Sequence, residues 1–201
     1  MYTPDHYKNE DIDQIKVFLR QHSFGILVTT ADKKPWATHI PLELDTDTEG
    51  HDILVGHIAK ANPQWQHFKE NEQVLCIFNG PHSYISSSWY AAEEVPTWNY
   101  IAVHVYGTLT LLDEKAVLAS LHKLVDNYEK ASKNPISLHD ISPKTMRQIK
   151  GIVGFQIKVT DIQATYKLSQ GREHDHPKII SELEERDGAG SKAIAQCMRK
   201  D

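Results

Sequence analysis

The stretch from His57 to Trp65, which reads HIAKANPQW, is the strongest candidate for chemistry. Its first residues end an apolar run typical of a buried strand, whereas Asn62-Pro63 is typical of a helix start, since asparagine caps helices and proline tolerates the first helical position. A helix start presents free backbone N–H groups that favour anions. Lys60 and His57 would add donors. The pattern indicates an anion site, although an ordinary capped helix with Lys60 in solvent explains the same residues.

A second candidate combines aromatic rings with hydroxyls and amides, in residues 80–90 and 95–100. The rings of Tyr90 and Trp98 could stack on a flat ligand while neighbouring serines and Asn99 bind its edges. The alternative is that these amphipathic rings lie at a core edge or at a subunit interface. Composition alone does not separate the two interpretations.

A third candidate is the polar segment from Lys167 to Arg172, which follows the last predicted strand. The Arg172 guanidinium could bind a phosphate or a carboxylate through two parallel hydrogen bonds. A surface arginine without a ligand is the simpler interpretation.

The sequence lacks the motifs of metal sites, nucleophilic catalysis and nucleotide-binding loops. The 12 histidines are scattered, and His174-Asp175-His176 and His104 have no third ligand at metal-binding spacing, so no metal is expected. Cys76 and Cys197 form no CxxC pair. The chain has no nucleophile elbow and no glycine-rich nucleotide loop, and no catalytic residue is identified.

Charge and hydropathy narrow the class of protein further. The net charge of -5 disfavours a globally basic nucleic-acid binder. No apolar run approaches the roughly 18–20 residues of a membrane span. Two isolated cysteines are typical of a reducing compartment, so we expect a cytoplasmic protein.

The elements that must position these residues are mostly strands. Apolar runs with short connections predict antiparallel strands. Helices are expected within the first 22 residues, after Asn62, over 113–130, from Ser142, and over about 178–186 and 191–199. The expected strands are 24–30, 36–44, 51–58, 74–78, 151–160 and 162–166, with 82–90 extended. Residues 97–112 are expected to form either one long strand or a bent pair with Gly107 as the kink. A chain of 201 residues with this order predicts a β-barrel with helical additions, an α+β fold.

Five separated motifs, in order, give the chain a family resemblance. The motifs are Met1–Pro4, His57–Trp65, residues 80–86 with Trp89-Tyr90, Val95–Tyr100 and Lys167–Gln170. With these motifs the chain resembles the PaiB family, described as FMN-binding negative transcriptional regulators linked to sporulation and degradative-enzyme synthesis. The resemblance covers residues 1 to about 172. The chain departs from the family pattern at Ser87, where a proline is common, and at Gly171-Arg172, where Asn-Arg is common.

The resemblance implies a fold and a domain division. The family is similar to six-stranded antiparallel FMN-binding split barrels related to pyridoxamine-phosphate oxidase, which form homodimers with flavin at the interface. It implies a split-barrel domain over 1–172, with a helical insertion at about 113–150. A C-terminal helical tail, 173–201, would follow.

The resemblance also implies which residues bind FMN. The phosphate is expected at His57, Lys60 and Asn62, with help from Arg172. Thr38 and His39 would lie near the flavin ring. Trp98, Asn99 and Tyr90 would line the cavity, from either protomer.

The resemblance leaves several functions open. The first is a flavoprotein with a regulatory role, exerted directly on DNA or indirectly through a ligand or protein. The second is an oxidoreductase that passes electrons from NAD(P)H through FMN, although no residue marks a substrate. The third is a haem-binding split barrel, with His104 or His174 as the iron ligand.

Overall fold

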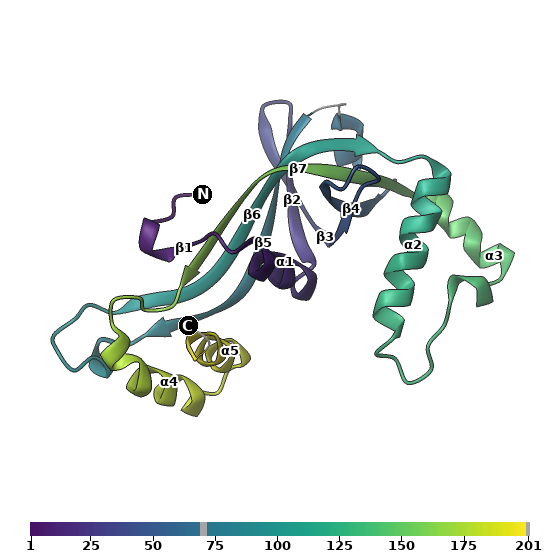
Figure 1. The fold of residues 1–201 in the computed structure, drawn as a ribbon. Helices are drawn as coiled ribbons and strands as arrows, with labels where there is room; N and C mark the ends of the chain where they lie inside the picture. Colours follow the sequence, from purple (N-terminus) through teal and green to yellow (C-terminus); the bar gives the residue numbers. More distant parts are fainter. Residues whose placement is uncertain (69–71, 200–201) are drawn as a thin grey trace. The chain divides into compact units, whose positions relative to one another are not determined.

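The computed structural model describes residues 1–68 and 72–199, with the side chain of Glu72 left out. Within this part of the chain, one sheet contains seven strands in the order β1-β7-β4-β3-β2-β5-β6, and β6 also pairs with β7 (Figure 1). Every strand pairing with a known register is antiparallel. The strands are β1 (Lys8–Asn9), β2 (Phe24–Ala31), β3 (Lys34–Thr46), β4 (Asp52–Ala59), β5 (Glu72–Ile85), β6 (Thr97–Leu111) and β7 (Ile152–Lys167).

The six-stranded barrel that the resemblance implied does not include β1, and neither do the strands expected from the sequence pattern. The pairing between β6 and β7 links six long strands in a ring, as expected of a barrel, and β1 adds a seventh strand to β7. Its two residues, Lys8 and Asn9, pair with Thr165 and Ala164. A strand this short has no alternation of apolar and polar residues, so the sequence carries no signal for it.

Two predicted strand ends were also wrong. β5 continues through Asn79-Gly80-Pro81 to Ile85, although that tripeptide is typical of a turn. A Cβ on Gly80 would lie 2.6 Å from the Phe18 ring and 3.1 Å from Ile101. Gly80 therefore serves close packing rather than a turn. β7 is likewise one strand where two were predicted.

Helices occupy both ends of the chain and the segment between β6 and β7. The predicted helix over 113–130 is confirmed as α2, capped by the Asp113 carboxylate, which accepts from the Ala116 N–H at 2.7 Å. Asn62 and Ser142 begin helical segments as expected. The helices are α1 (Ile12–Gln21), α2 (Glu114–Glu129), α3 (Pro143–Met146), α4 (His176–Glu185) and α5 (Ala189–Met198), with the 3-10 helix η2 at Pro63–His67.

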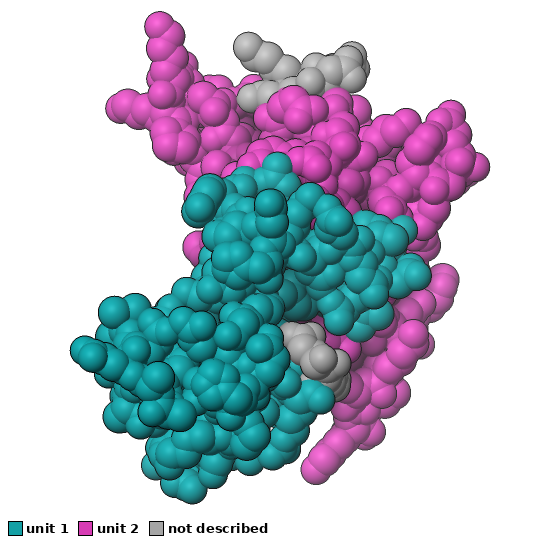
Figure 2. Space-filling model, turned by 60° about the vertical axis from the view of Figure 1, so that its left-hand side comes forward, with its two compact units in different colours: residues 1–18, 78–104, 163–201 teal, residues 19–77, 105–162 magenta. Residues whose placement is uncertain are grey.

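The chain divides into two compact units (Figure 2). Unit 1 comprises residues 1–18, 78–104 and 163–201, and unit 2 comprises 19–77 and 105–162. In unit 2 the core includes Leu27, Leu42, Leu54, Phe155 and Ile157, all fully buried.

Unit 1 includes the C-terminal helices. Ile179, Leu183 and Ile194 are fully buried, and the hydroxyls of Ser191 and Ser83 lie 3.0 Å apart. The division into a 1–172 domain and a 173–201 tail stays a prediction, and residues 200 and 201 lie outside the described part. No described helix has the length and apolar character needed to span a membrane.

Candidate functional site

The junction after β4 is built by backbone pairing. Ala59 pairs with Ile152 on β7, and the Lys60 N–H donates to the Gly151 carbonyl at 2.7 Å. Asn62 then caps η2, its Oδ1 accepting from the Gln64 N–H at 3.0 Å. η2 has five residues, too few to build a strong dipole, and Asn62 already occupies one of its N–H groups. An anion at this junction would depend on side-chain cations rather than on the helix end.

A buried polar network fixes η2 against β2 and β3. Gln64 is fully buried, and its Nε2 donates to the Thr29 hydroxyl at 3.0 Å. The Thr38 hydroxyl donates to Gln64 Oε1 at 2.5 Å and accepts from Asn62 Nδ2 at 3.1 Å. Thr38 and Asn62, both predicted to bind flavin, therefore have internal partners that hold the junction in place.

Lys60 is exposed and lines a groove with two further lysines, Lys115 of α2 and Lys150. We call this site, of about 880 Å³, the lysine groove. Within the described residues, none of the three ammonium groups has a hydrogen-bond or ion-pair partner, and Glu114 is the only acidic side chain in the lining. The apolar lining includes Leu111, Leu118, Met146, Ile149 and Ile152.

Close packing positions α2 beside the groove. A Cβ on Gly154 of β7 would lie 2.5 Å from Val117 Cγ2, so glycine allows α2 to approach the sheet. Val117 is buried at this contact. Lys115 and Leu118, on either side of Val117 in the sequence, line the lysine groove.

His57 does not share the lysine groove with Lys60. It lines a second cavity of about 340 Å³, which we call the His57 cavity. Burial lowers the pKa of His57, which favours its neutral form. His39, the other predicted histidine, is exposed on β3, and its ring centroid lies 6.4 Å from that of Phe24.

The other four predicted residues lie in unit 1. Asn99 is fully buried, and its Nδ2 donates to Ser169 Oγ at 2.9 Å and contacts Met198 Sδ at 3.7 Å. Arg172 forms an ion pair with Glu94, its Nε donating to Oε2 at 2.9 Å. Asn99 therefore forms hydrogen bonds inside the protein. The ion pair with Glu94 engages the Arg172 guanidinium, which a ligand would need.

Trp98 and Tyr90 are the more accessible members of this group. Trp98 is 48% exposed, and its indole N–H donates to His82 Nδ1 at 3.3 Å. Tyr90 is half-buried and lines a small polar cavity with Arg172 and Lys167. Burial is the main cause that raises the pKa of the Tyr90 phenol.

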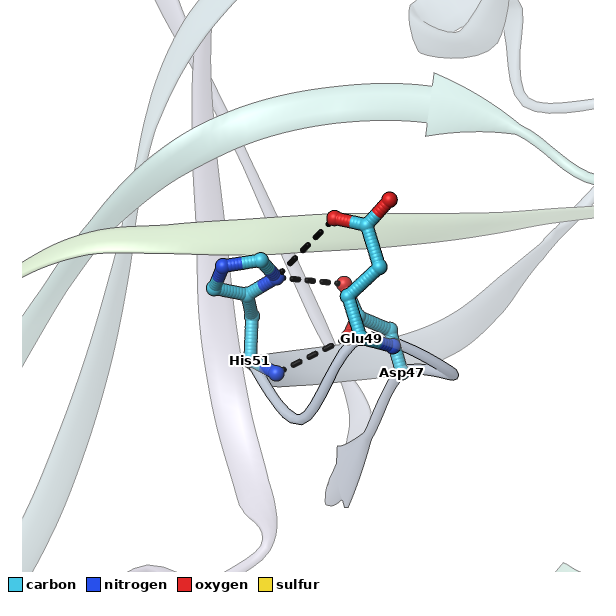
Figure 3. A group of neighbouring side chains, drawn as sticks. All are labelled: Asp47, Glu49 and His51. Atoms are coloured by element: carbon cyan, nitrogen blue, oxygen red, sulfur yellow. Dashed lines mark hydrogen bonds and ion pairs between the residues drawn. The ribbon is translucent and has the colours of Figure 1, made fainter.

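A cluster that the sequence analysis missed lies in the turn between β3 and β4 (Figure 3). The ligand atoms of Asp47, Glu49 and His51 lie within 4.8 Å of one another. Asp47 Oδ1 accepts the N–H groups of Glu49 and His51 at 2.9 and 2.8 Å, which lowers its pKa. These bonds close the turn and account for the cluster, so we assign it no metal.

Lys115 and Lys150 were also missed. They lie far from Lys60 in the sequence, and nothing in their local spacing marks them as binding residues. Only the packing of the segment between β6 and β7 brings them to the groove.

Comparison with known proteins matches the chain to a family and to curated relatives. The family described as "Putative FMN-binding domain" matches residues 1–161. The Bacillus subtilis (strain 168) protein named "Protease synthase and sporulation protein PAI 2" is 45% identical over 200 residues, covering 98% of this chain and 96% of its own.

Solved structures share the fold at low identity. The FAD and heme binding protein from Mycobacterium smegmatis has a TM-score of 0.63 at 12% identity, covering 80% of this chain and 73% of its own. The flavocytochrome Anf3 from Azotobacter vinelandii has the same TM-score at 13% identity, covering 80% and 69%. At these identities the likeness shows a common fold.

Proposed function

The chain belongs to the PaiB family of FMN-binding proteins, and from this premise we propose that it holds FMN by the lysine groove and acts as a flavin-dependent regulator. The family match and the relative confirm the predicted family, and FMN is the flavin named in the description of that family. The observation that carries the proposed binding site is the set of three lysines around an apolar groove, none of which has a side-chain partner in the described part of the chain.

The groove fits the chemistry of FMN. Three ammonium groups against one carboxylate leave an excess of positive charge for a phosphate, and each could form a charge-assisted hydrogen bond. The apolar lining suits the flat isoalloxazine ring, and the volume of about 880 Å³ lies in the range of small-molecule sites. When bound, FMN supplies redox chemistry, which the protein would position and shield.

The proposed phosphate site departs from the set that the family resemblance implied. Lys60 keeps its role, joined by Lys115 and Lys150, whereas His57 lines another cavity. Thr38 and Asn62 would act indirectly, by holding the junction that presents Lys60. Flavin contacts by His39, Trp98, Asn99, Tyr90 and Arg172 stay predictions.

We expect a homodimer, because unit 2 exposes an apolar side chain on the outward face of the hairpin formed by β2 and β3. Phe24 on β2 is 67% exposed, and its ring lies beside that of His39, which shares this face. A second copy related by twofold symmetry is the usual way to cover such a surface. Sedimentation velocity on wild type and Phe24→Asp tests this: a dimer that the substitution dissociates is expected, and a wild-type monomer contradicts it.

The regulatory role rests on the relative's name, which links that protein to protease synthesis and sporulation. Because the chain has a net charge of -5, direct DNA binding is disfavoured. We propose instead an indirect regulatory effect in the cytoplasm, through a ligand or a protein. A measurement of the rate of NADH and NADPH oxidation distinguishes the oxidoreductase alternative from the regulator. A rate above that of free FMN would favour the enzyme.

The binding proposal is tested by titrating the full chain with FMN and following flavin fluorescence. Wild type is compared with Lys60→Ala and Lys115→Ala, and with Lys144→Ala as the matched control. Lys144 is an exposed lysine of α3 that does not line the groove. Weaker binding in the first two variants alone supports the site. Equal binding in all four proteins contradicts it.

A further inference from the structure

The His57 cavity is small and is not used by the proposed flavin site. Its volume is about 340 Å³, and its walls come from β3, β4 and α2, with Arg20 from the last turn of α1. Ligand sites in proteins start at roughly 300 Å³. An occupant would therefore be a molecule of few heavy atoms.

Two charged groups of the cavity lining, Asp45 and Glu43, have hydrogen-bond partners within the protein. Lys123 Nζ donates to Asp45 Oδ2 at 2.5 Å, which neutralises both groups. The Tyr128 hydroxyl donates to Glu43 Oε1 at 2.7 Å. The bond from Tyr128 occupies one of the two carboxylate oxygens of Glu43.

Two groups of opposite charge remain available. In residues 1–68 and 72–199, neither the Arg20 guanidinium nor Glu43 Oε2 has a hydrogen-bond or ion-pair partner. Leu44, Val55 and Leu124 add apolar surface to the same lining. The cavity thus combines a free cation, a free carboxylate oxygen and an aliphatic wall.

We propose that the His57 cavity binds a free aliphatic L-amino acid. Arg20 would hold its carboxylate through two parallel N–H···O bonds, the geometry for which a guanidinium is suited. Its ammonium group would donate to Glu43 Oε2, and its side chain would contact the apolar wall. A simple carboxylate leaves Glu43 unpaired, and a simple amine leaves Arg20 unpaired.

The half-buried His57 is compatible with this ligand. Burial lowers the pKa of its imidazole, so near neutral pH the ring adds no positive charge beside the ligand ammonium group. Ser120 and Asn127 of α2 supply uncharged polar atoms to the same lining. The cavity therefore keeps a balanced charge when a zwitterion enters.

The proposed amino-acid site is separate from the lysine groove and does not rest on FMN binding. Lys123 and Asn127 of α2 line the His57 cavity, whereas Lys115 and Leu118 line the groove. Binding can be measured on the full chain without flavin, so the failure of one proposal leaves the other standing.

Calorimetry with L-alanine, L-valine and L-leucine tests the proposal. L-leucine at least is expected to bind. The analogues of L-leucine that lack one charge, 4-methylpentanoate and 3-methylbutylamine, should bind about tenfold more weakly or worse, as the loss of one charge-assisted bond predicts. Absence of binding by all three amino acids at millimolar concentration would overturn the proposal. So would an analogue that binds as well as L-leucine.

Three variants connect the binding to the cavity. Arg20→Gln and Glu43→Gln should each weaken the amino acid about tenfold. Arg20 is exposed, and the glutamine at position 43 keeps an acceptor for Tyr128, so both variants should fold. Arg147→Gln, at an exposed position outside the cavity, is the matched control. Equal affinity in all variants would place the ligand elsewhere and overturn the assignment.

Discussion

Lys60 and His57 belong to one short motif, yet their side chains line different cavities. His57 lies within β4, where it pairs with Gly154, whereas Lys60 follows the strand and its N–H bonds to Gly151. The two cavities use different stretches of α2 as a wall. A motif that looks like one phosphate site is therefore divided between two sites.

The first prediction concerns this division. Lys60→Ala should weaken FMN binding by about 1–3 kcal/mol, the loss expected for one charge-assisted hydrogen bond. His57→Gln should leave FMN affinity unchanged, because that side chain lies outside the lysine groove. Calorimetric titration measures both. A larger loss in the histidine variant than in the lysine variant would contradict the division.

The buried network at Gln64 should stabilise the fold. Gln64→Leu keeps the volume but removes the bonds to Thr38 and Thr29, so we expect a loss of about 1–3 kcal/mol in the free energy of unfolding. Urea denaturation measures the change. Gln66→Leu, at an exposed position of the same 3-10 helix, should have little effect. Equal effects would mean that the network adds no stability.

Gly107 allows β6 and β7 to close the ring of strands. A Cβ there would lie 2.4 Å from the Lys158 carbonyl oxygen and 2.5 Å from Ile157 Cγ2. Gly107→Ala should therefore cost about 1–3 kcal/mol, as overpacking does. Gly151→Ala is the control, because a Cβ there would have no described atom within 4 Å apart from those of its chain neighbours. Thermal unfolding of both proteins distinguishes a packing effect from a general effect of replacing glycine.

Stability should depend on pH through His57. Burial lowers its pKa in the folded protein, so below the ordinary histidine pKa of about 6.5 the unfolded chain binds more protons. The free energy of unfolding should then fall as pH drops from about 7 to about 5.5. His57→Gln should make this fall shallower without abolishing it, since burial also lowers the pKa of His22 and His104. An unchanged slope, measured by urea unfolding at several pH values, would count against the role of His57.

The strands and helices that carry long periodic patterns could be predicted from the sequence. β2, β4 and α2 occur where their apolar runs and the Asp113 cap indicate. β1 could not be predicted, because its two residues depend on the pairing offered by β7. The extension of β5 through Gly80 was missed because close packing, rather than a turn, determines that glycine.

The candidate site was predictable in part. The motif around Lys60 identified the junction, since strand end, cap and cation are local signals. Lys115 reaches the same groove through the packing of Val117 on Gly154, and Lys150 through the bond from the Lys60 N–H to Gly151, the next residue. Both are tertiary contacts with no local signature. In the folded chain Asn99 bonds to Ser169 and Arg172 pairs with Glu94, although both residue types are suited to binding a ligand.

The most direct test of FMN binding at the lysine groove is a visible absorption spectrum, recorded after adding FMN and then desalting. We predict that wild type retains the flavin bands and that a Lys60→Ala/Lys115→Ala/Lys150→Ala variant loses them, with folding checked by circular dichroism. A Soret band in the protein as purified would instead indicate haem. Wild type that emerges colourless, or a triple variant that keeps its flavin, would contradict the proposed site.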